Sequence, residues 1–511
     1  MKTSDFFQSL ERHNIFNYIF LIITIIFIRI FFEGVLEGWH NIGYTRFSYR
    51  SVLMYFVHFP LFYITTFLFI TLIITLILNE SIKNVIRAAS IGLILIIFVP
   101  VIDVILYGGC YITYPSRLEK YFLHFLNPFV SLLDIGISAG PRIIIVVISF
   151  FAGLYGYMKR KTTLKAILVF FSTLLAILFS GGVTTIIAGN QPENLYTSGG
   201  ILYSDTQKFS AIYAIFFLVL FFLTIYLYSK EDFFQLINSI RPERIALYGG
   251  LGIGGFILAR NQAGAFYKFN FFNSIALLFI FLSCGLGFWA LQILNDFFDI
   301  KTDIYSKQRN PLLKGIEKRY YSMCGIFISV LVLIISVILN YQAFLIMFTF
   351  LLLGVIYSVP PLRLKRFPLL STFILSIAVL LSLGVGYSVI YGEKTFHEFP
   401  EPLIYALITG ITIGFSAKDM SDIEGDKNNG IITLPVLLYR KESLMGRLPY
   451  SLLLGLSYLL VSIFLPEVLP GSLVASVITV IYTLFRKDPT EKFYFFLMYI
   501  YGIYLFFNLI T

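Results

Sequence analysis

The sequence predicts an all-α fold, a polytopic transmembrane helical bundle. Of its 511 residues, 58% are hydrophobic and only 13% are charged, which is typical of chains that lie in lipid. Apolar runs of membrane-spanning length recur from one end to the other, and the charged residues gather between them. These observations predict about fifteen spans, in two groups.

Residues 1–228 are predicted to form a separate membrane domain of six spans. The first apolar run, from Asn14 to Phe32, is too long for a signal peptide and lacks a small-residue cleavage site, so we expect a retained span. Arg29 in this first span and Asp103 in the third are intramembrane charges, and pairing between helices or snorkelling is preferred for Arg29. An apolar segment at 121–138 is expected to be re-entrant or interfacial. The six expected spans are 14–32, 52–78, 88–108, 143–158, 166–189 and 209–228.

A polar stretch from Ser229 to Arg244 marks the expected domain boundary. Residues 229–511 are predicted to form the second domain, with nine spans. Three cysteines and five histidines are scattered singly, so neither a disulfide framework nor a zinc site is expected. The nine expected spans are 245–260, 272–294, 320–339, 342–359, 369–391, 402–417, 449–465, 470–485 and 493–510.

The basic residues predict an orientation. A net charge of +10 is compatible with nucleic-acid binding, but the Lys and Arg residues cluster between spans, where orientation against anionic lipids explains them better. We therefore expect a bilayer and no nucleic acid as partner. If 229–244 is cytoplasmic, the loops of the second domain on that side hold seventeen basic residues, and the opposite loops hold only Arg260, Lys268 and Lys394. This split predicts a cytoplasmic N-terminus as well.

Two clusters of acidic residues lie at the ends of predicted spans in the second domain. Because their members are three or four residues apart, a helix would place each cluster on one side. Like charges that close repel unless a cation lies between them, and oxygen ligands without His or Cys suit Mg²⁺. Two facing clusters would hold a Mg²⁺-diphosphate. The first cluster contains Asn295, Asp296, Asp299 and Asp303, and the second contains Asp419, Asp422 and Asp426.

On this interpretation the carboxylates serve only to hold the metal. Replacing Asp299 or Asp422 by Asn is then expected to lower turnover while folding barely changes, or improves, because like-charge repulsion is relieved.

These clusters resemble the NDxxDxxxD and DxxDxxxD motifs of the UbiA superfamily of intramembrane prenyltransferases. The stretch from Tyr357 to Lys365, YSVPPLRLK, is similar to the tyrosine, proline and basic signature that the family carries between them. Gly425-Asp426 followed by GIITLP at 430–435 resembles the family's tail motif, and IRPE at 240–243 its entry segment. The resemblance covers about residues 230–511, with nine spans, and leaves the first domain unassigned.

The resemblance implies Mg²⁺-dependent transfer of an isoprenyl chain from an allylic prenyl diphosphate to a lipophilic or aromatic acceptor, with release of diphosphate. Many relatives place Arg directly before the proline that follows the first motif, whereas this chain has Arg309-Asn310-Pro311, so Arg309 stays open between a phosphate contact and a surface cation. The implied catalytic residues are Asp296, Asp299, Asp419, Asp422 and Tyr357. The implied metal ligands are Asn295, Asp296, Asp299, Asp303, Asp419, Asp422 and Asp426. The implied diphosphate contacts are Asn295, Arg363, Lys365, Lys418, Lys427 and Arg309.

The residues also bear on two other classes of function. An ion-coupled transporter would use the aspartates as cation sites, but such sites usually lie near the bilayer midplane rather than at span ends. A catalytically silent scaffold would not need the complete acidic set. The run Gly250–Gly255 formally matches GxGxxG, but it lies in an apolar span with no preceding strand, so close helix packing explains it better than nucleotide binding. Neither the length of the isoprenyl chain nor the identity of the acceptor follows from the sequence.

Overall fold

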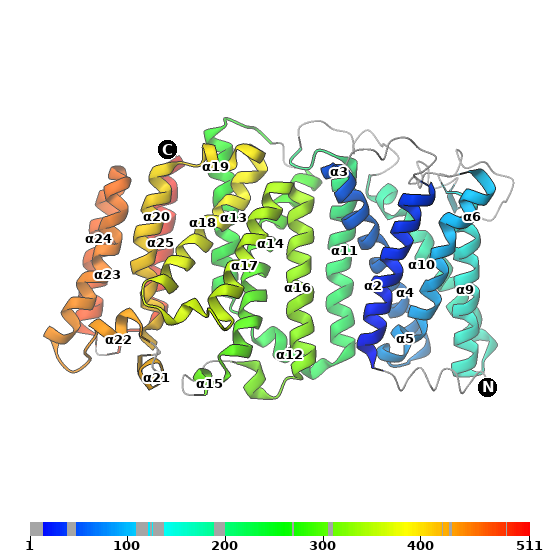
Figure 1. Cartoon of the computed structure of the whole chain (residues 1–511), viewed down its shortest axis with the longest axis horizontal. Coiled ribbons are helices and arrows are strands. Elements are labelled where there is room, and N and C mark those ends of the chain that lie inside the picture. The colour runs from blue at the N-terminus through cyan, green and yellow to red at the C-terminus, as the bar shows by residue number, and fades with distance from the viewer. Residues whose placement is uncertain are drawn as a thin grey trace. The chain divides into compact units, whose positions relative to one another are not determined.

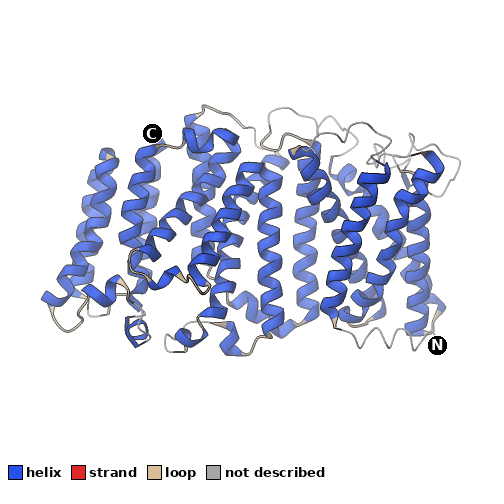
Figure 2. Ribbon diagram, viewed as in Figure 1, coloured by secondary structure: helices blue, strands red, loops and turns tan. Residues whose placement is uncertain are grey.

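The protein is described by a computed structural model that covers residues 14–37, 48–108, 121–122, 125, 137–188, 200–267, 270–304, 310–421, 423–428, 432–486 and 488–510. In these ranges the regular structure is helical, and none of it is strand (Figure 2). The predicted all-α class is therefore confirmed. The chain divides into two compact units, Met1–Phe233 and Phe234–Thr511.

The membrane class is also confirmed. Within the described ranges, 14 helices are long and apolar enough to cross a bilayer, six in the first unit and eight in the second. The prediction of about fifteen spans differs at one place. The segment predicted as 245–260 is a 21-residue helix, Pro242–Gln262, which is not among the 14. Its five glycines and Arg244 make it less apolar than its neighbours.

The first unit is a bundle in which α9 packs against α10, and both α10 and α11 pack against α4. Ser204 begins α11 with a capping box, because its hydroxyl accepts from the backbone N–H of Gln207 at 3.2 Å while the Gln207 side chain accepts from the backbone N–H of Ser204 at 3.0 Å. Its elements are α2 (Ile15–Phe32), η1 (Glu33–Glu37), α3 (Tyr49–Val52), η3 (Leu53–His58), α4 (Phe59–Leu78), α5 (Ile82–Leu93), η4 (Ile94–Ile97), α6 (Phe98–Tyr107), α9 (Ala139–Arg160), α10 (Thr163–Ala188) and α11 (Asp205–Tyr228).

The intramembrane charges of the first unit are buried and bonded. Arg29 is 0% exposed and pairs with Glu33 at 3.1 Å, so it pairs within its own helical segment and does not snorkel. Asp103 accepts from the Ser138 hydroxyl at 2.6 Å and from the backbone N–H of Gly140 at 2.8 Å. Most of the predicted segment 121–138 lies outside the described residues.

The second unit contains the remaining long helices (Figure 1). One residue, Asn340, separates two of them: its backbone N–H bonds to Ser336 at the end of α16, and its side chain accepts from Ala343 in the first turn of α17. α12 (Lys230–Asn238) crosses the boundary between the units. The elements that follow are α13 (Pro242–Gln262), α14 (Phe271–Phe298), α15 (Ile300–Asp303), η6 (Pro311–Lys314), α16 (Lys318–Leu339), α17 (Tyr341–Ser358), η7 (Leu364–Arg366), α18 (Leu370–Tyr391), η8 (Gly392–Lys394), α19 (Thr395–Glu398), α20 (Glu401–Gly414), η9 (Phe415–Ser421), α21 (Ile423–Asn428), α22 (Leu434–Leu438), α23 (Leu444–Phe464), η10 (Pro466–Val468), α24 (Leu469–Phe485) and α25 (Glu491–Ile510).

Close contact between α13 and α18 depends on glycine. A Cβ atom added at Gly255 would overlap the backbone carbonyl of Leu383, and one added at Gly386 would overlap the backbone of Gly252. The two helix backbones therefore touch, as small residues allow in membrane bundles. The packing interpretation of the glycine run is confirmed for Gly252 and Gly255, but not for Gly250, which faces open space.

We expect Gly255→Ala to destabilise the second unit by about 1–3 kcal/mol, because the added methyl group meets immobile backbone rather than a side chain that can rotate away. Gly250→Ala lies in the same helix with nothing within 4 Å, and should be neutral or stabilising by about 0.5–1 kcal/mol, since alanine favours helix more than glycine does. Thermal unfolding of both variants in detergent measures the difference, and equal unfolding temperatures would contradict the packing argument.

Candidate active site

A cavity of about 270 Å³ lies among the helices of the second unit, and residues from both acidic clusters line it. Asn295, Asp299 and Asp303 come from the first cluster, and Asp419 comes from the second. The fold thus brings two motifs that are distant in the sequence to one cavity. The rest of its wall combines basic and other polar side chains with apolar and aromatic ones.

The first cluster follows the end of α14. Asp299 is the C-cap residue, with φ −104° and ψ 5°, and the short helix α15 begins after it. The backbone N–H of Asp299 still donates to Asn295 at 3.0 Å, and that of Asp303 to Asp299 at 2.8 Å. Helical spacing therefore continues across the break, which explains why Asn295, Asp299 and Asp303 reach the same cavity.

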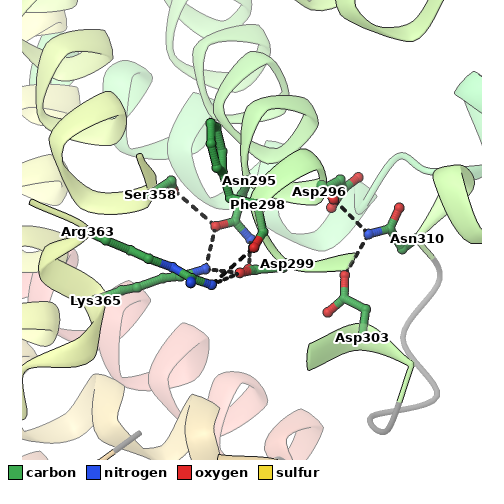
Figure 3. A network of polar contacts seen from close by, with 9 residues as sticks. All are labelled: Asn295, Asp296, Phe298, Asp299, Asp303, Asn310, Ser358, Arg363 and Lys365. Atoms are coloured by element: carbon green, nitrogen blue, oxygen red, sulfur yellow. Dashed lines mark hydrogen bonds and ion pairs between the residues drawn. The ribbon is translucent and has the colours of Figure 1, made fainter. Parts of the chain in front are cut away.

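Asp296 has a different environment. It is 2% exposed, does not line the cavity, and accepts a hydrogen bond from the Tyr321 hydroxyl at 2.6 Å. The side chain of Asn310 donates to the backbone carbonyl of Asp296 at 2.9 Å and to the carboxylate of Asp303 at 2.7 Å (Figure 3). Asp296 therefore helps to fix the end of α14 on its neighbours, and the expected grouping of all four residues on one side does not extend to it.

Asp299 is held between two cations. Arg363 donates to its carboxylate at 3.0 Å, and Lys365 forms an ion pair with the same oxygen (Figure 3). The side chains of Asp299 and Lys365 are each 13% exposed, so this attraction is only weakly screened by water. The side-chain oxygen of Asn295 accepts from Lys365 and from the Ser358 hydroxyl, both at 3.0 Å.

This geometry favours a different expectation for the effect of Asp299→Asn on folding. The Asp299 carboxylate has direct charged contacts with the cations of Arg363 and Lys365, which attract it. Removing its charge would leave two nearby cations uncompensated.

The two cations come from the segment that follows α17. That helix ends at Ser358 because the next residue precedes Pro360, and a residue before proline is disfavoured in helical conformation. Arg363 then takes a left-handed backbone conformation, with φ 38° and ψ 57°, which is uncommon outside glycine. The chain turns there, and both Arg363 and Lys365 reach Asp299.

The second cluster contributes Lys418 and Asp419 from η9. The Lys418 ammonium bonds to the Asp419 carboxylate at 2.6 Å and also interacts with the hydroxyl of Tyr357. Lys427 is exposed and does not line the cavity. Asp422 and Arg309 lie outside the described residues, and the side chain of Asp426 is not described, so their predicted roles stay predictions.

The described lining of the cavity is electrically balanced, with four basic and four acidic side chains. Burial lowers the pKa of Lys365, and the Asp299 carboxylate opposes that shift. Burial also raises the pKa of Asp303. The eight charged side chains are Arg241, Arg244, Lys365, Lys418, Asp299, Asp303, Asp419 and Glu491.

The donor set fits a hard divalent cation in its chemistry. Asn295, Asp299, Asp303 and Asp419 present amide and carboxylate oxygens, which Mg²⁺ prefers. Among the residues that the structure describes, no three His, Cys, Asp or Glu side chains are grouped closely enough to bind a metal by themselves. Mg²⁺ in proteins usually keeps several water ligands and often takes oxygens from its substrate as well.

Several residues of the site carried no assigned role in the sequence analysis. Arg244 pairs with Glu491 and places its guanidinium 3.7 Å from the ring centroid of Phe495. Tyr248 stacks on Phe288 with ring centroids 5.0 Å apart, and both line the cavity. Arg241, which also lines the cavity, lies in the entry segment IRPE at 240–243. Arg244, Tyr248, Phe288 and Glu491 reach the site through tertiary packing, which a motif spacing in the sequence does not reveal.

Comparison with known proteins identifies relatives of the second unit. The model of the UbiA prenyltransferase family matches residues 261–503. Digeranylgeranylglyceryl phosphate synthase of Pyrococcus horikoshii is 27% identical over 242 residues, which cover 44% of this chain and 80% of the relative. Probable homogentisate phytyltransferase 2 of Oryza sativa subsp. japonica is 26% identical over 265 residues, which cover 47% of this chain and 67% of the relative.

A solved structure of a UbiA homolog from Archaeoglobus fulgidus, bound to GPP and Mg²⁺, is 17% identical to this chain. The alignment covers 54% of this chain and 99% of that one, with a TM-score of 0.39.

We expect Asp299→Asn to destabilise the second unit by about 1–3 kcal/mol, somewhat less than the ~3–5 kcal/mol typical of a fully buried pair. Adding Lys365→Met to this variant should recover part of the loss, because one of the uncompensated cations is then removed. The exposed pair Lys441–Asp488 offers a matched control, since Asp488→Asn should leave the unfolding temperature unchanged. Thermal unfolding in detergent with chelator measures all variants. An Asp299→Asn protein as stable as the parent would contradict the assigned ion pairs.

Proposed function

We propose that the second unit, whose residues 261–503 match the model of the UbiA prenyltransferase family, transfers an isoprenyl chain from an allylic prenyl diphosphate to a lipophilic or aromatic acceptor, releasing diphosphate. The observation that carries the proposal is the single cavity in which the two acidic motifs meet the basic signature. Its polar groups lie at the ends of α14, α17 and α20, which gives no support to a transport site at the bilayer midplane.

The polar part of the cavity is suited to a diphosphate. Lys365 and Lys418 each present an ammonium group to it, and Arg241 and Arg244 line the same wall. A lysine ammonium contacts phosphate as a point charge, whereas arginine offers a planar fork. Arg363 does not line the cavity, so we propose that it acts on Asp299 rather than on the substrate.

The apolar part is suited to the isoprenyl chain. Tyr248, Phe288 and Phe350 line it as an aromatic group, with the Tyr248 and Phe350 centroids 5.7 Å apart. When the allylic carbon–oxygen bond breaks, its electron pair stays with the diphosphate and the carbon gains positive charge. Aromatic faces stabilise such charge where water is excluded. The acceptor then forms a bond to that carbon and loses a proton.

We propose Asn295, Asp299, Asp303 and Asp419 as the described ligands of Mg²⁺, together with Asp422 and Asp426. When bound, Mg²⁺ would act as a Lewis acid and template for the departing diphosphate. The balanced charge of the cavity supports this assignment. Its four basic side chains already offset its four carboxylates, so the several negative charges of a diphosphate need a further cation to neutralise them. In this scheme Asp296, bonded to Tyr321, positions the end of α14 and does not ligate.

The acceptor is proposed only by class. The two named relatives differ in class according to their names, one a synthase of a glyceryl phosphate lipid and the other a phytyltransferase acting on homogentisate, an aromatic compound. Glycerol-phosphate lipids, quinone precursors and chlorophyll-like acceptors all remain within the proposal.

We expect purified protein to release diphosphate from geranylgeranyl diphosphate only with Mg²⁺ and an acceptor lipid extract. A saturated analogue of the same length should react at least about 10²-fold more slowly, since it cannot delocalise the developing positive charge. Diphosphate release and radiolabelled product measure both rates. Activity that survives chelation, or equal rates with the saturated analogue, would refute the mechanism.

We also propose that the loops near the site face the cytoplasm, as the split of basic residues predicts. Figure 1 shows α15 and α21 at one end of the second unit and α19 at the other. The site therefore lies at one membrane boundary of the unit, and only its side remains to be assigned.

Single cysteines test the assignment in a protein whose three native cysteines are replaced. Lys314 and Glu393 are both exposed. Lys314 ends η6, which follows α15 in the chain, and Glu393 lies in η8, directly before α19. We expect a membrane-impermeant maleimide to label Glu393→Cys in intact cells, and Lys314→Cys only after the membrane is opened. The reverse pattern would overturn the proposed orientation.

We propose that residues 1–228 form a separable domain without a reacting group. A protein that starts near Ser229 should then keep turnover within about tenfold of the full chain when it is shown to be folded and inserted. Diphosphate release by the two proteins in the same nanodiscs measures this. Loss of turnover in a folded truncation would show that the first unit shapes the active site or delivers substrate.

A further inference from the structure

The first unit contains a larger cavity than the candidate active site. Its volume is about 720 Å³, and residues of α4, α5, α9 and α10 line it. This lies in the range of cavities that hold small-molecule ligands, about 300–1,000 Å³. The described lining residues include no Asp, Glu, Lys, Arg or His. A charged ligand such as a diphosphate would therefore find no compensating charge there.

Two hydroxyl groups in this cavity point to a ligand that has an oxygen. Thr66 of α4 and Thr173 of α10 are 8% and 0% exposed, and their Oγ1 atoms have no hydrogen-bond partner among the described residues. Two other hydroxyls of the same helices bond to the backbone: Thr71 donates to Leu68 at 2.8 Å and Ser180 to Ala176 at 2.9 Å. Leaving a buried hydroxyl without a partner is unfavourable.

Two other hydroxyl groups of the cavity lining differ from these two threonines. The Ser138 hydroxyl donates to Asp103 at 2.6 Å, and the Tyr121 hydroxyl donates to the backbone carbonyl of Leu178 at 3.2 Å. These groups already have partners in the protein, so the two threonine hydroxyls are the better candidates for bonds to a ligand.

Apolar residues continue the cavity wall from each threonine along its helix. On α4, Phe62 and Ile70 lie four residues before and after Thr66, and both line the cavity. On α10, Ile177 follows Thr173 by four residues and lines it too. α4 and α10 pack directly against each other. The wall thus combines apolar residues with one threonine hydroxyl on each of these two helices.

We propose that this cavity binds an uncharged lipid, with its apolar chain between α4, α5, α9 and α10 and an oxygen atom hydrogen-bonded to Thr66 and Thr173. A threonine hydroxyl both donates and accepts, so a hydroxyl, carbonyl or ether oxygen satisfies it. Isoprenoid alcohols and acylglycerols share this chemistry. The inference does not depend on the reaction proposed for the second unit.

The test uses the full chain in nanodiscs and two photoreactive probes, a diazirine-bearing hexadecanol and the matching hydrocarbon without the hydroxyl. We expect saturable labelling by the alcohol in peptides of α4 and α10. Replacing both threonines by valine, which keeps the shape and removes the hydroxyls, should weaken binding of the alcohol about tenfold and leave that of the hydrocarbon unchanged.

Matched controls separate recognition from folding. Thr184 lies on the same helix as Thr173, is 0% exposed and also has an Oγ1 without a partner among the described residues, but it does not line the cavity. Thr184→Val should therefore leave labelling unchanged. Ala89→Phe, which adds a ring to the lining, should reduce labelling by both probes. Unfolding temperatures establish that each variant is folded.

Competition identifies the source of the ligand. Unlabelled geranylgeraniol that displaces the probe at lower concentration than dioleoylglycerol would assign the site to an isoprenoid, and the reverse order would assign it to an acyl lipid. Labelling that does not saturate, or a folded double valine variant that binds the alcohol as the parent does, would overturn the proposal.

Discussion

The candidate active site depends on the charge balance around Asp299. This carboxylate is mostly buried at the end of a membrane-spanning helix, where an uncompensated charge is costly. Arg363 and Lys365 supply the compensation, and the left-handed turn at Arg363 brings them into reach. One set of contacts therefore joins the end of α14 to the segment after α17. Ser358 extends it by bonding to Asn295.

Much of this architecture was accessible from the sequence, because membrane helices are defined by local composition. The lengths of the apolar segments predicted the membrane class and nearly all spans. The predicted span at α13 is not among the 14 candidate spans, because its glycines allow close packing against α18 but lower the hydropathy of the helix. Helical spacing also predicted that Asn295 and Asp299 share a surface, and their backbone hydrogen bond shows why. Both inferences needed only neighbours within a few residues.

What the sequence could not supply was the choice among partners. Asp296 and Asp299 are three residues apart and chemically identical, yet one bonds to Tyr321 and the other to Arg363 and Lys365. The direction of each side chain is set by which helix packs against that face of α14, and spacing contains no information on that. The interpretation based on repulsion among carboxylates was incomplete for the same reason, since it considered the members of a cluster without the cations that packing brings to them.

The balance of charges has a consequence for binding. With four basic and four acidic side chains in its described lining, the cavity attracts neither a lone diphosphate nor a lone divalent cation strongly. On the proposed function, a diphosphate and a divalent cation that bind together would largely offset each other's charge. Asp299 and Asp419 would then contact the metal instead of Lys365 and Lys418, and these two lysines would contact phosphate oxygens. This exchange couples the two binding events. Substitution of Lys365 would then weaken metal and diphosphate binding together, whereas a residue that serves diphosphate alone would affect only one of them.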